Sequence, residues 1–299
     1  MKILIIGGSG FLSGTLARES VRAGHEVWVV TRGNKALPQG VRAIQADRQN
    51  RPAFAAAIQN AGTAWDLCVD CIGYDLEDAR QDIEVFKRLA QHVVFISTDF
   101  VLDPARRRLP LTEEFAQFQT AGYGAKKRAC ERAFFEAGTA LKWTLLRPCH
   151  IYGPGSQLGC LPLHGRDPEL LRKLRGGEIL KLVGGGHFLQ QPILARDLSE
   201  MILSCAGNAK TFGEAYLAAG PDIIESREYY RIIADVLGVE LRIEEVSAAA
   251  YLAEHADAAP FLCHRIYDLS KARQHGLKMP RTPIEEGLRE HIAALAGTD

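Results

Sequence analysis

The chain has 299 residues, enough for one large α/β unit or for two smaller domains that share a cleft. Its 36 Lys and Arg residues balance 36 Asp and Glu residues, which argues against a general attraction to nucleic acid or to an anionic membrane. Its 7 cysteines are an odd number spread over the chain, which argues against a disulfide framework and leads us to expect reduced thiols in a cytoplasmic protein.

The first half of the chain alternates short apolar runs with segments of helical periodicity. The first run, Ile3 to Ile6, is too short for a signal peptide, and no apolar stretch is long enough to span a bilayer. The runs lie at residues 3–6, 27–30, 41–44, 67–69, 93–96 and 143–146. Most are continuously apolar, as are parallel strands covered on both faces, and helical patterns such as 12–23 and 76–90 lie between them. This order predicts right-handed crossovers and a doubly wound parallel α/β sheet.

After Arg147 the elements become shorter and less regular. We expect a helix over 168–174, a glycine turn at 184–186, a helix over 197–205, a strand over 215–217 and a helix over 226–237. The sequence shows no flexible linker before this region. We therefore expect a large domain over 1–150, which also takes back part of 190–225, and a smaller C-terminal α/β lobe over 151–299. The cleft between two such lobes is the expected ligand site.

A glycine-rich loop, Gly7-Gly8-Ser9-Gly10-Phe11-Leu12, lies between the first expected strand and the first expected helix. Glycines here let the backbone turn sharply and approach a pyrophosphate, whose charge meets free N–H groups and the positive end of the helix. Glycines can also simply start a helix, but the position within a βαβ unit favours dinucleotide binding. The expected fold is therefore of the Rossmann type, and the expected cofactor contacts in this loop are Gly7, Ser9, Gly10, Phe11 and Leu12.

The second expected strand runs into Thr31 and Arg32, which bear on the choice of dinucleotide. An Asp or Glu at this place would bind the adenosine ribose hydroxyls of NAD and disfavour a 2′-phosphate. That acid is missing, and the guanidinium of Arg32 can bind a phosphate. We therefore favour NADP over NAD as the cofactor. The alternative is that Arg32 is only a solvated loop residue.

Tyr123 and Lys127 stand four residues apart, a spacing that places both on one face of a helix. A phenol titrates far above neutrality, and a nearby ammonium lowers its pKa, so such a pair can transfer a proton. Thr98 and Asp99 follow the expected strand at 93–96, at the carboxyl edge where open α/β sheets bind ligands. The Thr98 hydroxyl can bind a substrate oxygen or start the loop, and Asp99 can assist proton transfer or cap the loop.

Four motifs in this order resemble the extended short-chain dehydrogenases/reductases, in their NAD(P)-dependent epimerase/dehydratase branch. They are the glycine loop, the Ser-Thr-Asp run at 97–99, the Tyr-x-x-x-Lys element and the Arg-Pro-Cys-His-Ile-Tyr-Gly-Pro segment at 147–154. The resemblance extends over nearly the whole chain, with further matches at 197–198 and 267–271. It implies a homodimer formed by helices that flank the Tyr-x-x-x-Lys element.

The resemblance also implies roles for individual residues. Tyr123 would be the general acid/base, Lys127 would lower its pKa and bind the nicotinamide ribose, and Thr98 would orient the substrate oxygen. Further cofactor contacts would be made by Asp47 at the adenine, by Cys71, Ile72 and Gly73 along the cofactor, and by Pro148 beside the nicotinamide. The protein would supply orientation and proton transfer, and the cofactor would carry the redox chemistry.

The chain departs from this family pattern at four places. Ser13 stands where the third glycine of the loop usually is, and Phe100 stands where dehydratases have a Glu, which argues against dehydration. Gln190 stands where sugar-nucleotide enzymes offer an arginine to the diphosphate. The stretch 260–263, before Tyr267, is apolar and shows no second phosphate-binding arginine. A smaller or less anionic hydroxy or keto compound is therefore expected rather than a nucleotide sugar.

Other polar residues give weaker signals. Cys68 and Cys71 form a Cys-x-x-Cys, but a strand would point them to opposite faces and no second pair lies at zinc spacing, so we expect structural thiols and no metal site. The run Arg106-Arg107-Arg108 is typical of a solvated face, with an anion clamp over the substrate mouth as the alternative. His150 and His187 are more typical of structural residues than of cleft ligands.

These patterns predict an NAD(P)-dependent oxidoreductase or epimerase that acts on the carbinol or keto carbon of a sugar-like or other small hydroxy compound. The alternative is a cofactor-bound regulatory, structural or RNA-associated protein of the same fold, because a fold does not fix a function. The Tyr123/Lys127 pair favours the enzyme, and the basic run lacks the interleaved aromatic residues that stack on bases. We expect a small-molecule substrate and no nucleic-acid or membrane partner.

Overall fold

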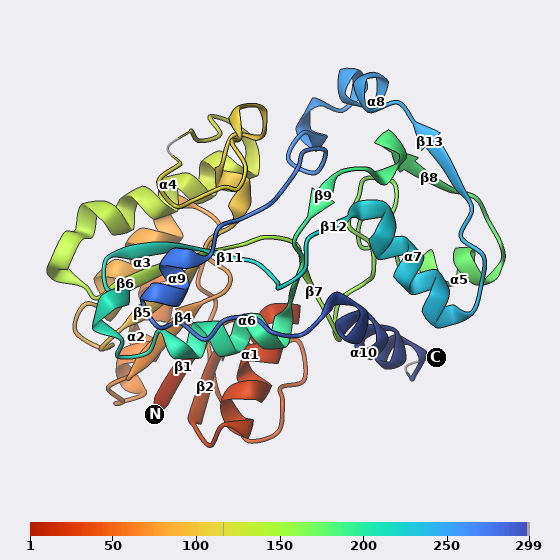
Figure 1. Cartoon of the computed structure of the whole chain (residues 1–299). Helices are drawn as coiled ribbons and strands as arrows, with labels where there is room; N and C mark the ends of the chain where they lie inside the picture. The colour runs from red at the N-terminus through yellow and green to blue at the C-terminus, as the bar shows by residue number, and fades with distance from the viewer. Residues whose placement is uncertain (116, 298–299) are drawn as a thin grey trace.

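The computed structural model describes residues 1–115 and 117–297 and shows two lobes side by side (Figure 1). The larger lobe is built on a seven-stranded parallel sheet in the order β11-β6-β5-β4-β1-β2-β3. Its strands are β1 (Lys2–Ile6), β2 (Glu26–Thr31), β3 (Val41–Gln45), β4 (Leu67–Asp70), β5 (Val93–Ile96), β6 (Trp143–Pro148) and β11 (Glu214–Ala218). The predicted Rossmann-type doubly wound sheet is confirmed.

Helices cover both faces of this sheet, which explains why its central strands are mostly apolar. One face packs on α1 (Phe11–Arg22) and α6 (Ala195–Ser204). The other packs on α2 (Arg51–Asn60), α3 (Leu76–Phe86) and α4 (Gly122–Ala137). Alternate residues of β1 enter the two separate cores, Ile3 and Ile5 on the first face and Leu4 and Ile6 on the second.

The smaller lobe has a core of its own, built by three helices and three pairs of short strands. The helices are α5 (Leu170–Arg175), α7 (Ser226–Leu237) and α10 (Ile284–Ala296). The strand pairs are β7 (Ile151–Tyr152) with β10 (Ile193–Leu194), β9 (Leu189–Gln190) with β12 (Ile224–Glu225), and β8 (Leu180–Val183) with β13 (Ile243–Val246). In Figure 1 this lobe lies to the right, with α8 (Ala248–Glu254) at its upper edge.

The second half of the chain contributes to both lobes. Strand β11 pairs with β6 at the edge of the large sheet, and α6 packs against α1. After α8 the chain crosses back, because Ala258 belongs to the small core whereas Tyr267 and the helix α9 (Ser270–Gln274) pack on the large one. The two lobes are thus connected by several chain passages. Within the described residues, no helix is both long and apolar enough to cross a membrane.

Candidate functional site

The carboxyl ends of the parallel strands meet at one edge of the sheet, where open α/β folds bind ligands. The glycine loop follows β1, the Cys71 loop follows β4, Thr98 follows β5 and Pro148 ends β6. Because all of these strands are parallel and neighbouring, the structure brings the predicted cofactor and catalytic residues to this one edge.

The glycine loop is pressed against the end of β2. A Cβ on Gly8 would lie 2.4 Å from Val29, and the Gly7 N–H donates to Val30 O at 3.0 Å. Helix α1 begins at Phe11, so the first N–H groups of its opening turn have no partner within the helix. The buried Ser13 hydroxyl accepts from the Gly10 N–H at 3.2 Å, and thus the small side chain fits beneath the loop. This cradle, which a Cβ would fill, matches what a dinucleotide pyrophosphate requires.

The groups expected at the adenosine end lie on the surface beside this loop. Thr31 ends β2 and its hydroxyl accepts from the Gly33 N–H at 3.2 Å, while the Arg32 side chain is exposed. Asp47 follows β3, is exposed and accepts from the Gln49 N–H at 3.0 Å. Both Arg32 and Asp47 are therefore accessible to a bound nucleotide.

The loop after β4 lies directly beneath the candidate catalytic helix. Ile72 N–H donates to the carboxylate of Asp70 at 2.8 Å, which turns the chain at Cys71. A Cβ on Gly73 would meet Asp70 Oδ2 and the Phe95 ring, each at 2.4 Å, so only glycine fits. Burial raises the pKa of the Cys71 thiol, which forms no disulfide with any described residue.

Tyr123 stands in the first turn of α4, at the open edge, and the residue is 47% exposed. The helix can approach this edge because Gly124 faces the carbonyl of Phe100, from which a Cβ would be only 2.0 Å away. The Tyr123 ring consequently packs edge-on against the Phe100 ring, with centroids 6.4 Å apart. An exposed phenol is thus fixed above the end of β5.

Lys127 lies one turn further along α4, buried beneath this surface. Its ammonium donates to Gly73 O and to Ile96 O, each at 2.6 Å, and lies over the Phe95 ring at 4.3 Å. Burial lowers the pKa of Lys127, and the nearby Asp70 carboxylate opposes that shift. The ammonium therefore joins the loop after β4 to the end of β5.

The expected lowering of the Tyr123 pKa is absent in this structure. Burial raises the pKa of Tyr123 to about 12, Tyr74 and Asp99 add to the rise, and Arg166 opposes it. The physical reason is that the Lys127 ammonium points to two backbone carbonyls and the phenol is partly desolvated.

Thr98 and Asp99 begin a short 3₁₀ turn, Asp99–Val101, directly after β5. The Thr98 hydroxyl oxygen accepts from the Phe100 N–H at 3.2 Å, so its own proton remains for another acceptor. Asp99 is 1% exposed and receives Arg265 through two bonds, from Nε at 2.8 Å and from Nη2 at 2.7 Å. The Tyr267 hydroxyl also donates to it. Asp99 is therefore held in a buried ion pair.

Two buried arginine side chains lie at this ion pair: Arg265, which the sequence patterns did not single out, and Arg107 of the basic run. Arg265 stands two residues before Tyr267, just beyond the apolar stretch 260–263, and its guanidinium is bound to Asp99. Arg107, the middle residue of the basic run, has a 4% exposed side chain whose Nη2 lies 3.9 Å from Asp99 Oδ2. The solvated-face interpretation of the run is therefore wrong for Arg107. The chain pattern offered no signal that separates Arg107 from its neighbours.

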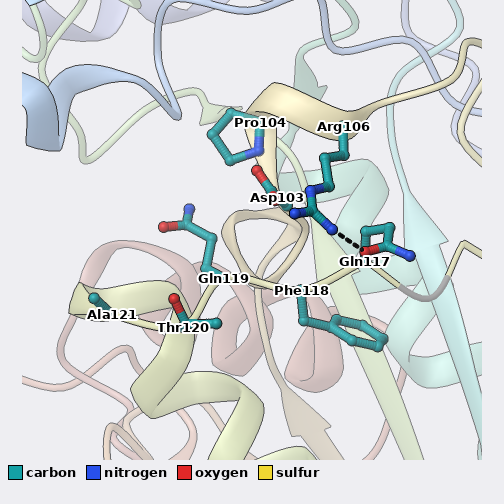
Figure 2. A pocket seen from close by; sticks show the side chains of 8 residues that line it. All are labelled: Asp103, Pro104, Arg106, Gln117, Phe118, Gln119, Thr120 and Ala121. Atoms are coloured by element: carbon teal, nitrogen blue, oxygen red, sulfur yellow. Dashed lines mark hydrogen bonds and ion pairs between the residues drawn. The ribbon is translucent and has the colours of Figure 1, made fainter.

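Arg106 has a different environment. Its guanidinium donates to Gln117 Oε1 at 3.1 Å, and both residues line a cavity of about 410 Å³ beside the start of α4. Figure 2 shows the two side chains joined by this hydrogen bond. This cavity is lined by Asp103, Pro104, Arg106, Gln117, Phe118, Gln119, Thr120 and Ala121. Its wall is formed by the loop that carries the chain from β5 to α4. Arg108 is exposed.

The two histidines also differ. Burial lowers the pKa of His150 to about 3, so its ring is neutral, and Arg265 acts in the same direction. His187 lies on the surface between Glu225 and Arg227. Arg166, which the sequence did not single out, reaches from the smaller lobe to the glycine loop, with its guanidinium 5.9 Å from the Phe11 ring centroid.

The comparisons with known proteins agree with this geometry. The NAD dependent epimerase/dehydratase family matches residues 3–219. The chloroplast stem-loop binding protein of 41 kDa b from Arabidopsis thaliana is 25% identical over 73% of this chain, which spans only 58% of that protein. The 2-alkyl-3-oxoalkanoate reductase of Stenotrophomonas maltophilia is 27% identical, over 99% of this chain and 100% of that protein. The Thermus thermophilus UDP-glucose 4-epimerase, solved with NAD, shares the fold with a TM-score of 0.78 at 18% identity over 100% of both chains. This chain belongs to the NAD dependent epimerase/dehydratase family.

Proposed function

We propose that the protein is an NADP-dependent oxidoreductase that acts on the carbinol or keto carbon of a small hydroxy or keto compound. The observation that carries the proposal is the exposed Tyr123 phenol one helical turn from the buried Lys127 ammonium, at the carboxyl edge of β5. The relative from Stenotrophomonas maltophilia, which aligns with the whole chain, is named as a reductase. Epimerisation uses the same residues and differs only in whether the keto intermediate is re-reduced before release.

The residues would divide the work as follows. The loop 7–12 would hold the pyrophosphate, Arg32 a 2′-phosphate, Asp47 the adenine, and the segments 71–73 and Pro148 the rest of the cofactor. When bound, the nicotinamide supplies or accepts the hydride. Lys127 would bind the nicotinamide ribose.

Proton transfer at the substrate oxygen is the part of the reaction left to the protein. Tyr123 would donate a proton to that oxygen during reduction and remove it during oxidation. Thr98 would donate its free hydroxyl proton to the same oxygen and hold it in place. Tyr123 has a pKa of about 12, so its phenol is protonated at neutral pH. Reduction requires a proton donor in this state. We assign no proton transfer to Asp99, since both of its oxygens bind Arg265.

A second candidate function comes from the relative of Arabidopsis thaliana, which is named as a stem-loop binding protein. A binding protein has no need of an exposed phenol above a buried ammonium, so we favour the enzyme. The two functions differ in a simple observable: one consumes or interconverts a small molecule, and the other does not.

The test compares wild type with Tyr123→Phe, using Tyr251→Phe of α8 as the matched control. Each protein is titrated with NADPH and NADH and then screened for turnover of hydroxy and keto compounds. We expect all three to bind NADPH alike and Tyr123→Phe alone to lose turnover, by about 10²- to 10⁴-fold, which is the usual size of a proton-transfer contribution. Net NADPH consumption would indicate a reductase, and an isomerised product without it an epimerase.

Two results would contradict the proposal. If no dinucleotide binds, the cofactor assignment fails. If cofactor binds but no protein turns over any compound, while a stem-loop RNA binds equally to wild type and Tyr123→Phe, the non-catalytic function is supported instead.

A further inference from the structure

Arg107 carries a buried guanidinium whose hydrogen-bonding groups are unused. Its side chain is 4% exposed, and its Nε, Nη1 and Nη2 atoms have no hydrogen-bond partner among residues 1–115 and 117–297. Its Nη2 approaches Asp99 Oδ2 only to 3.9 Å, which is too long for a hydrogen bond. A guanidinium has five N–H donors and is always charged, so leaving it unpartnered in the interior is costly.

Asp99 cannot neutralise Arg107, because it is already engaged. Both of its oxygens bind Arg265, and Oδ2 also accepts from the Tyr267 hydroxyl. Two buried guanidinium groups thus face one carboxylate. The neighbouring groups add no negative charge, because burial raises the pKa of Tyr267 and of the Cys149 and Cys263 thiols. This buried cluster therefore has a net charge of +1.

Two more buried side-chain nitrogens without a partner in the described structure lie on adjoining segments. Gln190, on β9, is 1% exposed, and its Nε2 has no partner among the described residues. Its neighbour Leu189 accepts the Arg265 N–H at 2.8 Å, so β9 runs beside the segment that carries Arg265. The buried Nε2 of His150 likewise lacks a partner in the described part of the chain, and Arg265 is the strongest charge acting on that ring.

The cluster is connected to the candidate catalytic site by one aromatic ring. Phe100 contacts Tyr123 on one side, with ring centroids 6.4 Å apart, and the Arg265 guanidinium lies 4.9 Å from the centroid of the same ring. Phe261 packs edge-on to it at 4.8 Å. The order Tyr123, Phe100, Arg265 places a cationic site one ring away from the phenol, with apolar surface between them.

We propose that Arg107, which shares Asp99 with Arg265, binds a single anionic group of the substrate, with the unpartnered Gln190 amide on the adjoining strand β9, and that this group is a carboxylate. The inference builds on the proposed function, with the reacting carbon at Tyr123, an apolar stretch along Phe100 and the anion at Arg107. A guanidinium matches a carboxylate in shape and charge, and one such group balances the single excess charge of the cluster. A phosphate monoester has related chemistry and is distinguished below.

The test measures anion binding without turnover, so its outcome is independent of the cofactor and of the reaction. The probes are acetate, its neutral isostere acetamide, and inorganic phosphate, each titrated at constant ionic strength in a dilute Tris buffer while thermal unfolding is followed. The proteins are wild type, Arg107→Met, Arg107→Lys and the matched control Arg108→Gln, which removes the adjacent exposed arginine.

We expect acetate, but not acetamide, to raise the unfolding midpoint of wild type and of Arg108→Gln, with a dissociation constant on the order of millimolar for so small a ligand. Arg107→Met should weaken acetate binding by about tenfold or more, the usual loss for a charge-assisted hydrogen bond, and Arg107→Lys by less. Without any anion, Arg107→Met should be at least as stable as wild type, because it removes an unpartnered buried cation. Tighter binding of phosphate than of acetate would identify the group as a phosphate monoester and overturn the carboxylate assignment.

Equal effects of acetate and acetamide on wild type would overturn the proposal, and this comparison does not depend on any variant folding. Acetate binding that is unchanged in Arg107→Met, or lost equally in Arg108→Gln, would overturn it as well. If acetate binds as expected but no cofactor does, the anion site stands and the proposed oxidoreductase function fails.

Discussion

Burial separates two different roles of the arginines in this protein. Arg265 is buried and held by Asp99, and Arg48 is buried among the carboxylates of Asp70, Asp78 and Asp82. Such arginines are structural, because removing one leaves uncompensated buried charge. Arg32 is exposed beside the cofactor loop and is free to meet a ligand. The same side chain therefore stabilises the fold in one place and is available for recognition in another.

The exposed position of Arg32 leads to a prediction about cofactor choice. Arg32→Gln should raise the dissociation constant of NADPH by about tenfold, the usual loss of a charge-assisted hydrogen bond, and leave that of NADH unchanged. Lys35→Gln removes an exposed cation from the same loop and is the control for a general effect of charge. Fluorescence titration of the reduced cofactors measures both constants. An equal loss for NADPH and NADH, or an equal effect of both substitutions, would contradict NADP selection by Arg32.

At the scale of elements, helix α4 is fixed to the sheet by a close backbone approach and by a buried ion pair. Glu131 accepts from Arg147 at 2.8 and 2.9 Å, from Arg128 at 2.8 Å and from Ser97 at 2.7 Å, which connects the helix to β5 and β6. Gly124 allows the first turn to reach the carbonyl of Phe100. The position of Tyr123 depends on both features.

The close approach predicts the effect of a single methyl group. Gly124→Ala should lower the free energy of unfolding by about 1–3 kcal/mol, because its Cβ would lie 2.0 Å from Phe100 O and the helix must move. In Gly14→Ala, a helical control, the nearest contact of the new Cβ is 3.5 Å, and higher helix propensity should make the change neutral or stabilising. Urea unfolding measures both. Equal stability of the two variants would show that α4 is not held at Phe100.

The elements themselves follow closely from sequence patterns. The apolar runs predict the six strands of the first half, and each expected strand lies within the observed one. Those patterns are local, since apolar periodicity reports which faces of an element are buried. Boundaries are less well defined: the expected helix over 76–90 ends at Phe86, and the helix expected to start at residue 197 begins at Ala195.

At the scale of the whole molecule, the contacts that define the candidate site could not be derived from local patterns. Asp99 and Arg265 are 166 residues apart in the chain, and they meet because Leu111 forms a bridge with Tyr267 as the chain crosses between the lobes. Three adjacent arginines look alike in sequence, yet only Arg107 turns inward. The glycine loop and the Tyr123/Lys127 pair could be predicted because each is a short motif on one element.

Both lobes bury neutral histidines, which makes the stability of the whole molecule dependent on pH. Burial lowers the pKa of His92 in the larger lobe to about 4 and that of His150 at the candidate site to about 3. Burial also lowers the pKa of His291 on α10. A histidine in the unfolded chain has a pKa of about 6.5. Because the buried histidines have lower pKa values, the unfolded chain binds more protons than the folded one below that pH. Stability contributed by these histidines is therefore complete above about pH 6.5 and is lost as the pH falls toward the folded pKa values.

We expect the free energy of unfolding to fall steadily between about pH 6.5 and pH 5, before most carboxylates are protonated. Each buried histidine adds a slope of at most about 1.4 kcal/mol per pH unit, so His92→Gln should flatten the curve by up to that amount, whatever its effect on absolute stability. His255→Gln replaces an exposed histidine and is the control for the substitution itself. The measurement is urea unfolding at a series of pH values. Parallel curves for wild type and His92→Gln would mean that His92 binds protons equally in the folded and unfolded states, and that the loss of stability in acid arises from carboxylates such as Asp70 and Glu131 instead.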